Sequence, residues 1–157
     1  LATHPPVQEE LARGELSAEQ VGKEALRLYP PTWLFVRQSL QSDQLTGNYR
    51  IPAGTKVYLS QYLTHRLESV FDQPERFLPG RDHPEDAGAF FPFGRGPRRC
   101  PAQRLAQLQV SGFLQRLSEQ FRLEALTKSV RPVGGITLRP EGAVWVRLRR
   151  REVSSGC

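Results

Sequence analysis

One segment of the chain reads Phe90-Phe91-Pro92-Phe93-Gly94-Arg95-Gly96-Pro97-Arg98-Arg99-Cys100-Pro101-Ala102, an aromatic, glycine-rich loop that carries one cysteine. Pro101 suits the first position of a helix, so we expect the loop to deliver Cys100 to a helix N-terminus. Backbone N–H groups, the helix dipole and the neighbouring Arg98 and Arg99 all stabilise an anion there. The segment therefore predicts a thiolate that acts as a nucleophile or as a metal ligand. A nucleophilic cysteine normally needs a histidine base, and no motif places a histidine beside it.

The composition excludes several other kinds of protein. The chain has 157 residues, 38% of them hydrophobic, which is one domain's worth of sequence with enough apolar residues for a core. No apolar run approaches the ~20 residues of a membrane-spanning helix. Three histidines and two cysteines, Cys100 and Cys157, are too few for a disulfide framework or a zinc site with several ligands. Any metal would have one protein ligand, with a cofactor supplying the rest.

The charge is formally +6, which could favour nucleic acid. The basic residues are spread along the chain, however, and cluster only at Arg147 and in 149–151. Such a terminal cluster is more typical of a solubilising tail, so we expect no nucleic-acid partner.

Periodicity and turn residues predict an α+β chain that is mainly helical. We expect helices over 5–13, 18–29 and 101–119, the second opened by a Ser17-x-x-Gln20 capping box. Short antiparallel strands are expected between Trp33 and Ser60, with 49–51 and 56–59 among them. Proline and glycine predict a long irregular stretch from Glu68 to Pro97, and a hairpin of 130–138 with 143–148 should close the fold.

The spacing Phe93-x-x-Gly96-x-Arg98-x-Cys100 resembles the heme-binding loop of the cytochrome P450 family, in which the cysteine is the axial ligand of the heme iron. The resemblance implies heme b (iron protoporphyrin IX) as the cofactor and Cys100 as its metal ligand. It also implies that Phe93, Gly96, Arg98 and Ala102 belong to the cofactor site. The family usually has glycine two residues beyond the cysteine, where this chain has Ala102.

Two further motifs extend the resemblance. Glu24-Ala25-Leu26-Arg27 is similar to the family's Glu-x-x-Arg pair, and Pro74-Glu75-Arg76-Phe77 to its Pro-x-Arg-Phe segment. In the family these motifs join in a buried ionic triad, which implies a structural triad of Glu24, Arg27 and Arg76. The two negatively charged heme propionates need basic partners, for which Arg37, His65 and Arg98 are the candidates.

The motifs follow the family order, which implies that residues 1–148 are the C-terminal part of a cytochrome P450 domain and that 149–157 are a flexible basic tail. The N-terminal part of the fold is expected to precede Leu1, and the family's acid–alcohol pair for oxygen activation is not found in this chain. The resemblance implies that the whole protein is a heme-thiolate monooxygenase, which inserts one oxygen atom from dioxygen into an organic substrate. A heme-thiolate isomerase, a peroxygenase, a non-functional fragment and a basic binding module are the alternatives, and the isolated chain is expected to be inactive.

The expected partners are a small hydrophobic organic substrate and an acidic electron donor, such as ferredoxin, flavodoxin or a reductase. Arg95, Arg99 and Arg104 flank the cysteine and are expected to form the docking patch for that donor. We expect a cytoplasmic protein, with a membrane anchor before Leu1 left open.

Overall fold

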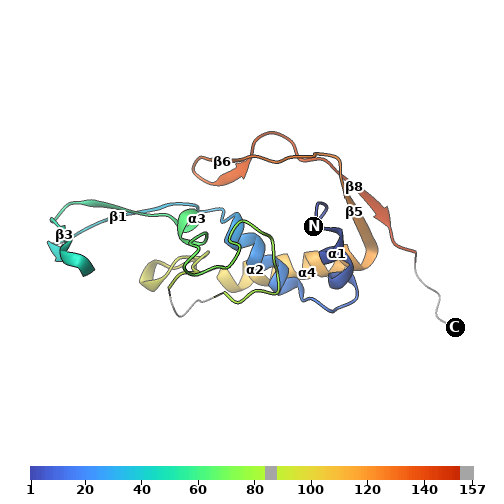
Figure 1. Ribbon diagram of the computed structural model, residues 1–157, viewed down its shortest axis with the longest axis horizontal. Helices are drawn as coiled ribbons and strands as arrows, with labels where there is room; N and C mark the ends of the chain where they lie inside the picture. The colour runs from blue at the N-terminus through green and yellow to red at the C-terminus, as the bar shows by residue number, and fades with distance from the viewer. Residues whose placement is uncertain (84–87, 153–157) are drawn as a thin grey trace.

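The computed structural model describes residues 1–83 and 88–152. Its longer helices are α1 (Pro5–Ala12), α2 (Ala18–Leu28) and α4 (Gln103–Gln120), and α3 (Gln61–Thr64) is a single turn. Two 3-10 turns, η1 (Thr46–Asn48) and η2 (Gly96–Arg98), complete the helical elements of the described part. Figure 1 shows an elongated molecule in which α1 and α2 pack along α4.

Two of the three longer helices, α1 and α2, begin where the sequence predicts. Prolines occupy the first turn of α1. The capping box at the start of α2 is confirmed: the Ser17 hydroxyl accepts the Gln20 backbone N–H, and the Gln20 side-chain oxygen accepts the Ser17 backbone N–H. The third predicted helix, α4, starts two residues later than expected, because Pro101 and Ala102 form a turn before it.

The strands predicted between Trp33 and Ser60 form two antiparallel pairs. Strand β1 (Phe35–Gln38) pairs with β4 (Lys56–Leu59), and the two-residue strands β2 (Asp43–Gln44) and β3 (Arg50–Ile51) pair beyond them. Together they form an arm that projects away from the helices in Figure 1.

The prediction for the C-terminal strands was wrong in its pairing. Strand β5 (Phe121–Ala125) pairs with β8 (Val146–Arg150), while β6 (Pro132–Gly134) pairs with β7 (Leu138–Pro140) inside the loop between them. Strand β5 was missed because it follows α4 directly, without a glycine or proline to mark the change. The predicted tail also starts too early, because Arg149 and Arg150 face Arg122 and Phe121 in the β5–β8 ladder. The last five tail residues, 153–157, lie outside the described residues.

Two small apolar clusters and Leu28 of α2 make up the buried apolar core of the described part. One consists of Leu11, Leu16, Ala18 and Val21 between α1 and α2, and the other of Phe71, Ala89 and Phe90 in the irregular region. Between α3 and η2 the described residues contain no helix or strand, as predicted. This region is held mainly by polar contacts, with Glu24, Arg27, Gln61 and His65 all fully buried. No helix of the described residues is long and apolar enough to cross a bilayer.

Candidate functional site

Cys100 lies between η2 and α4 as a free, partly buried thiol. Its backbone N–H donates to the Phe93 carbonyl at 2.8 Å, which closes the loop from Phe93 to Cys100. Its own carbonyl accepts from the Gln103 amide, so the cysteine is joined to the first residue of α4. The predicted delivery of this cysteine to the start of a helix is thus seen, with two turn residues in between.

The two glycines in the loop serve its backbone geometry. Gly94 and Gly96 have φ angles of 76° and 71°, in the left-handed region that glycine adopts without strain. A Cβ on Gly94 would lie 3.4 Å from the Phe35 ring, so strand β1 packs directly against this loop. No atom lies within 4 Å of a Cβ placed on Gly96, which leaves that side of the loop open.

The contact of Phe35 with Gly94 places Arg37 on the same side of β1, because side chains two residues apart share one face of a strand. The Arg37 guanidinium is exposed and lies 5.4 Å from the centre of the Phe35 ring. Arg98, at the end of η2, is also exposed. Two of the three predicted propionate ligands are therefore accessible near the cysteine loop.

His65 differs from the expectation. Its ring is fully buried, Nε2 accepts the Phe91 N–H at 3.0 Å, and the rings of Phe90 and Phe91 lie beside it. The ring therefore packs against the cysteine loop and, in the described residues, exposes no surface to which a propionate could bind. Burial lowers the pKa of His65 from 6.5 to about 4, which keeps the ring neutral at pH 7.

The Glu24–Arg27 pair is present and fully buried in α2. Arg27 donates to both Glu24 carboxylate oxygens, with Nε 2.8 Å from Oε2 and Nη2 2.9 Å from Oε1. Its remaining N–H groups bind the carbonyls of His65, Pro74 and Arg76. All five guanidinium donors are therefore paired, and α2 is tied to two segments of the irregular region.

The third member of the triad with Glu24 and Arg27 is Arg81, and the prediction of Arg76 was wrong. Arg81 Nε lies 3.0 Å from Glu24 Oε1, and its side chain is 10% exposed. Arg76 instead points its guanidinium outward to Gln73 and joins the network only through its carbonyl. A sequence signal existed, because Pro79-Gly80-Arg81 repeats the Pro-x-Arg spacing of Pro74-Glu75-Arg76. His83, whose Nε2 lies 3.1 Å from Glu24 Oε2, was also missed.

Burial of Glu24 by itself raises the pKa of its carboxyl. The hydrogen bonds from Arg27, His83 and the Leu78 amide outweigh that effect and lower the pKa to about 2. Glu24 is therefore an ionised carboxylate with every oxygen occupied, which suits a structural role and leaves no free base for chemistry.

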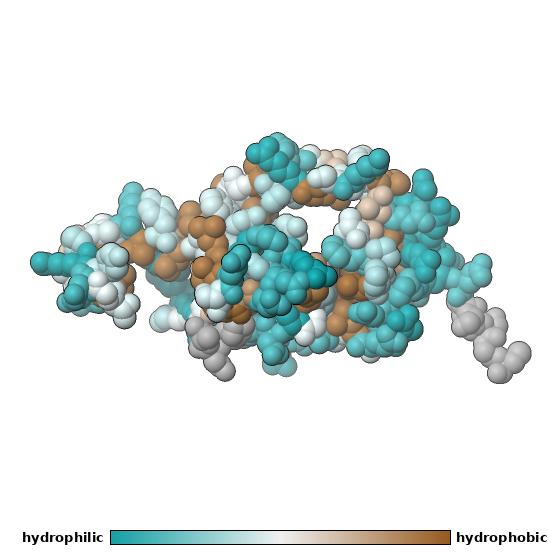
Figure 2. All heavy atoms as spheres, in the orientation of Figure 1, coloured by the Kyte–Doolittle hydropathy of each residue, from teal (hydrophilic) through white to brown (hydrophobic). Residues whose placement is uncertain are grey.

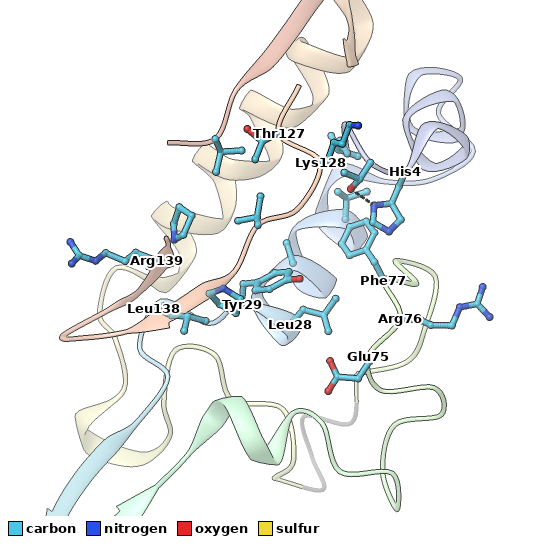
Figure 3. A pocket seen from close by; sticks show the side chains of 18 of the residues that line it. His4, Leu28, Tyr29, Glu75, Arg76, Phe77, Thr127, Lys128, Leu138 and Arg139 are labelled. Carbon is cyan, nitrogen blue, oxygen red and sulfur yellow. Dashed lines mark hydrogen bonds between the residues drawn. The ribbon is translucent and has the colours of Figure 1, made fainter. Parts of the chain in front are cut away.

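Two hollows lie on the described surface. A small one of about 220 Å³ lies beside the cysteine loop, where Phe90–Gly96 and Arg99 meet Gln103 and Gln107 of α4. A larger one of about 820 Å³ lies between α2, α4 and the C-terminal strands, and the opening is visible in Figure 2. Figure 3 shows Tyr29, Phe77 and Leu138 around this larger space, with Arg76 and Arg139 extending away from it. Neither Cys100 nor any other cysteine-loop residue lines it.

The loop is a site with one partly exposed thiol before a long helix and exposed arginines on either side of it. Among the described residues no three His, Cys, Asp or Glu side chains cluster to hold a metal, so a metal bound at Cys100 would take its other ligands from a cofactor. The family model for Cytochrome P450 matches residues 17–145. The chain belongs to the cytochrome P450 family, whose members bind heme and are, in general, oxidoreductases of the monooxygenase type.

Similar proteins support this assignment along nearly the whole chain. The chain is 37% identical over 137 residues to the probable cytochrome P450 4aa1 of Drosophila melanogaster, covering 83% of this chain and 27% of that protein. It is 34% identical over 156 residues to mouse cytochrome P450 4V2, covering 95% of this chain and 30% of that protein. The chain thus spans less than a third of the length of these curated relatives.

The fold agrees with solved structures. CYP175A1 of Thermus thermophilus matches 97% of this chain with a TM-score of 0.83 at 35% identity, and the match covers 39% of that structure. A six-coordinated cytochrome P450 from the same species gives a TM-score of 0.80 at 37% identity over 97% of this chain, which is 42% of that structure. The mixture of helices and small antiparallel sheets is therefore part of the cytochrome P450 fold.

Proposed function

We propose that the Cys100 thiolate is the axial ligand of a heme iron and that the holoenzyme carrying this chain is a monooxygenase for a small hydrophobic substrate. The observation that supports this most strongly is the free, partly exposed Cys100, whose N–H binds the Phe93 carbonyl next to a glycine turn and whose carbonyl binds the first residue of α4. A bound heme would supply the activation of dioxygen, with a thiolate ligand favouring cleavage of the O–O bond.

The residues around the cysteine suit such a cofactor. Phe93 and Gly96 form the loop that presents the thiol, and the backbone at Gly96 is not covered by neighbouring atoms. Arg37 and Arg98 would pair with the two propionates, since both guanidinium groups are exposed near the loop. Ala102 caps α4 without a side-chain hydrogen bond, so its methyl group is the only change from the glycine that the family usually has there.

Arg95, Arg99 and Arg104 are exposed around the cysteine loop, and we assign them to the docking of an acidic electron donor such as ferredoxin, flavodoxin or a reductase. Small electron-transfer interfaces depend on opposite charges mainly for the rate of encounter. The proposal also treats residues 1–148 as part of one cytochrome P450 domain and places the holoenzyme in the cytoplasm. Cell fractionation tests the location.

Turnover under isotopically labelled dioxygen, with an electron donor present, tests the reaction. A monooxygenase places one labelled atom in the product and the other in water. A product labelled only from hydrogen peroxide would indicate a peroxygenase. A rearranged product without label would indicate an isomerase. A protein that takes up no heme would instead favour the alternative hypothesis of a basic binding module.

A further inference from the structure

Gln61 and His65 bind both backbone groups of one residue in the cysteine loop, Phe91. Gln61 Nε2 donates to the Phe91 carbonyl at 2.5 Å, and His65 Nε2 accepts the Phe91 N–H at 3.0 Å. Gln61 is the first residue of α3 and His65 is its C-cap, so the four-residue spacing places both side chains on one face of the helical turn. Both side chains are fully buried.

The pair binds Phe91 while leaving other polar atoms unsatisfied. His65 Nε2 is an acceptor, so the proton of the neutral ring is on Nδ1. Among the described residues neither His65 Nδ1 nor Gln61 Oε1 has a hydrogen-bond partner. Buried polar atoms without partners destabilise a fold, and apolar side chains of similar size would fill the same space without that loss. The contact with Phe91 is thus the feature that these two polar residues provide.

Phe91 is connected to Cys100 through one tight turn. Besides accepting from Gln61, the Phe91 carbonyl accepts the Gly94 N–H at 2.9 Å, which forms the turn 91–94. Phe93, inside this turn, accepts the Cys100 N–H at 2.8 Å. A shift of the Phe91 backbone would therefore move the Phe93 carbonyl, which positions the cysteine.

The opposite end of the same chain of contacts is anchored in α2. Arg27 Nη1 donates to the His65 carbonyl at 2.8 Å, and Arg27 is itself paired with Glu24. The buried ion pair thus holds the backbone of His65, and the side chain of His65 holds the loop.

We propose that Gln61 and His65 are positioning residues, which fix the turn 91–94 and through it the geometry of the Cys100 thiolate at the heme iron. This inference rests on the proposed role of Cys100. It assigns to the two residues an effect on iron ligation that acts through Phe91, since both side chains hydrogen-bond to Phe91 and not to Cys100 in the described residues.

The test uses the heme-loaded holoenzyme and its reduced carbon monoxide complex, in which thiolate-ligated heme has a red-shifted Soret band. His65→Leu removes the acceptor and Gln61→Met removes the donor, each at similar volume. We expect either variant to raise the fraction of complex without the thiolate band about fivefold, because one net hydrogen bond shifts an equilibrium by about that factor. His65→Gln, which retains an acceptor at the end of the side chain, should restore most of the band.

Gln8→Met is the matched control. Gln8 is a buried glutamine that also binds both backbone groups of one residue, accepting the Leu123 N–H and donating to the Leu123 carbonyl, but it joins α1 to β5. This variant should unfold at a lower temperature while the thiolate band stays at the parent level.

The inference is overturned if His65→Leu and Gln61→Met retain the parent's thiolate fraction and only melt earlier, as Gln8→Met does. If His65→Leu fails to retain heme, the same comparison of Gln61→Met with Gln8→Met decides, because Gln61→Met leaves the His65–Phe91 bond in place. A parent protein that itself lacks the thiolate band would overturn the proposed function and this inference with it.

Discussion

Arg81 Nε lies 3.0 Å from Glu24 Oε1, although 57 residues separate the two along the chain. The Arg81 guanidinium also binds the carbonyls of Asp72, Gln73 and Arg76, so one side chain fastens the irregular region to α2. Arg27 reaches the same region through the carbonyls of Pro74 and Arg76. The two arginines and Glu24 therefore form the joint between the helical part of the fold and the segment that leads to Cys100.

Arg81→Ala should destabilise the holoenzyme far more than Arg76→Ala. Removing one partner of a buried ion pair costs about 3–5 kcal/mol, whereas the exposed Arg76 guanidinium contributes less than about 0.5 kcal/mol. Urea unfolding followed by heme absorbance measures both variants. Equal losses of unfolding free energy for the two variants would contradict the assignment of Arg81 to the triad.

Acid should destabilise the protein in two successive ranges of pH. The pKa of His65 is about 4 in the folded protein against 6.5 ordinarily, so its contribution is complete above pH 6.5 and decreases as the pH falls towards 4. The pKa of Glu24 is about 2 against 4.5, so its contribution is complete above pH 4.5 and is lost as the pH falls towards 2. Across its own pH range, each group changes the free energy of unfolding by about 3 kcal/mol.

Urea unfolding at a series of pH values checks the first range. The His65→Gln variant should lose less stability than the parent between pH 6.5 and 4, because glutamine does not titrate. Parallel curves for the parent and the variant would show that His65 is not the titrating group.

Arg37→Ala and Arg98→Ala should each accelerate heme loss by about tenfold, because a hydrogen bond to a charged group contributes about 1.5–3 kcal/mol. Transfer of heme to an excess of a heme-free acceptor protein measures the rate. Arg50→Ala is the control, since Arg50 is an exposed arginine on β3 in the projecting arm. The propionate assignment fails for any variant that releases heme no faster than Arg50→Ala.

Reversing the charges of Arg95, Arg99 and Arg104 to glutamate should slow reduction by an acidic ferredoxin or flavodoxin by about tenfold at low salt. The effect should shrink as salt is added, while the heme spectrum stays unchanged. Reversal of three other exposed cations, Lys56, Lys128 and Arg139, changes the net charge equally and should have a smaller effect. If both triple variants are slowed to the same extent, these arginines have no particular part in docking.

Local signals in the sequence predicted the elements that depend on neighbouring residues. The capping box at Ser17, the prolines in the first turn of α1 and before α4, and the glycine turns around Cys100 all act within a few residues. The spacing from Phe93 to Cys100 could also be interpreted from the sequence, because the hydrogen bonds that shape this loop join residues close together in the chain.

Features set by distant contacts could not be predicted in this way. Two Pro-x-Arg segments offered equivalent arginines, and only the folded chain brings Arg81 within reach of Glu24. His65 is a titratable residue in a polar segment, and its full burial depends on Phe90 and Phe91, which are 25 and 26 residues away. The pairing of β5 with β8 likewise depends on which strands the fold brings together.

The most direct test of the proposed role of Cys100 is the absorbance spectrum of the reduced carbon monoxide complex of the holoenzyme, compared with that of the Cys100→His variant. The parent should show the red-shifted Soret band of thiolate-ligated heme, and the variant should bind carbon monoxide without that band, because imidazole has replaced the thiolate as the iron ligand. A red-shifted band that persists in the Cys100→His variant would show that Cys100 is not the axial ligand.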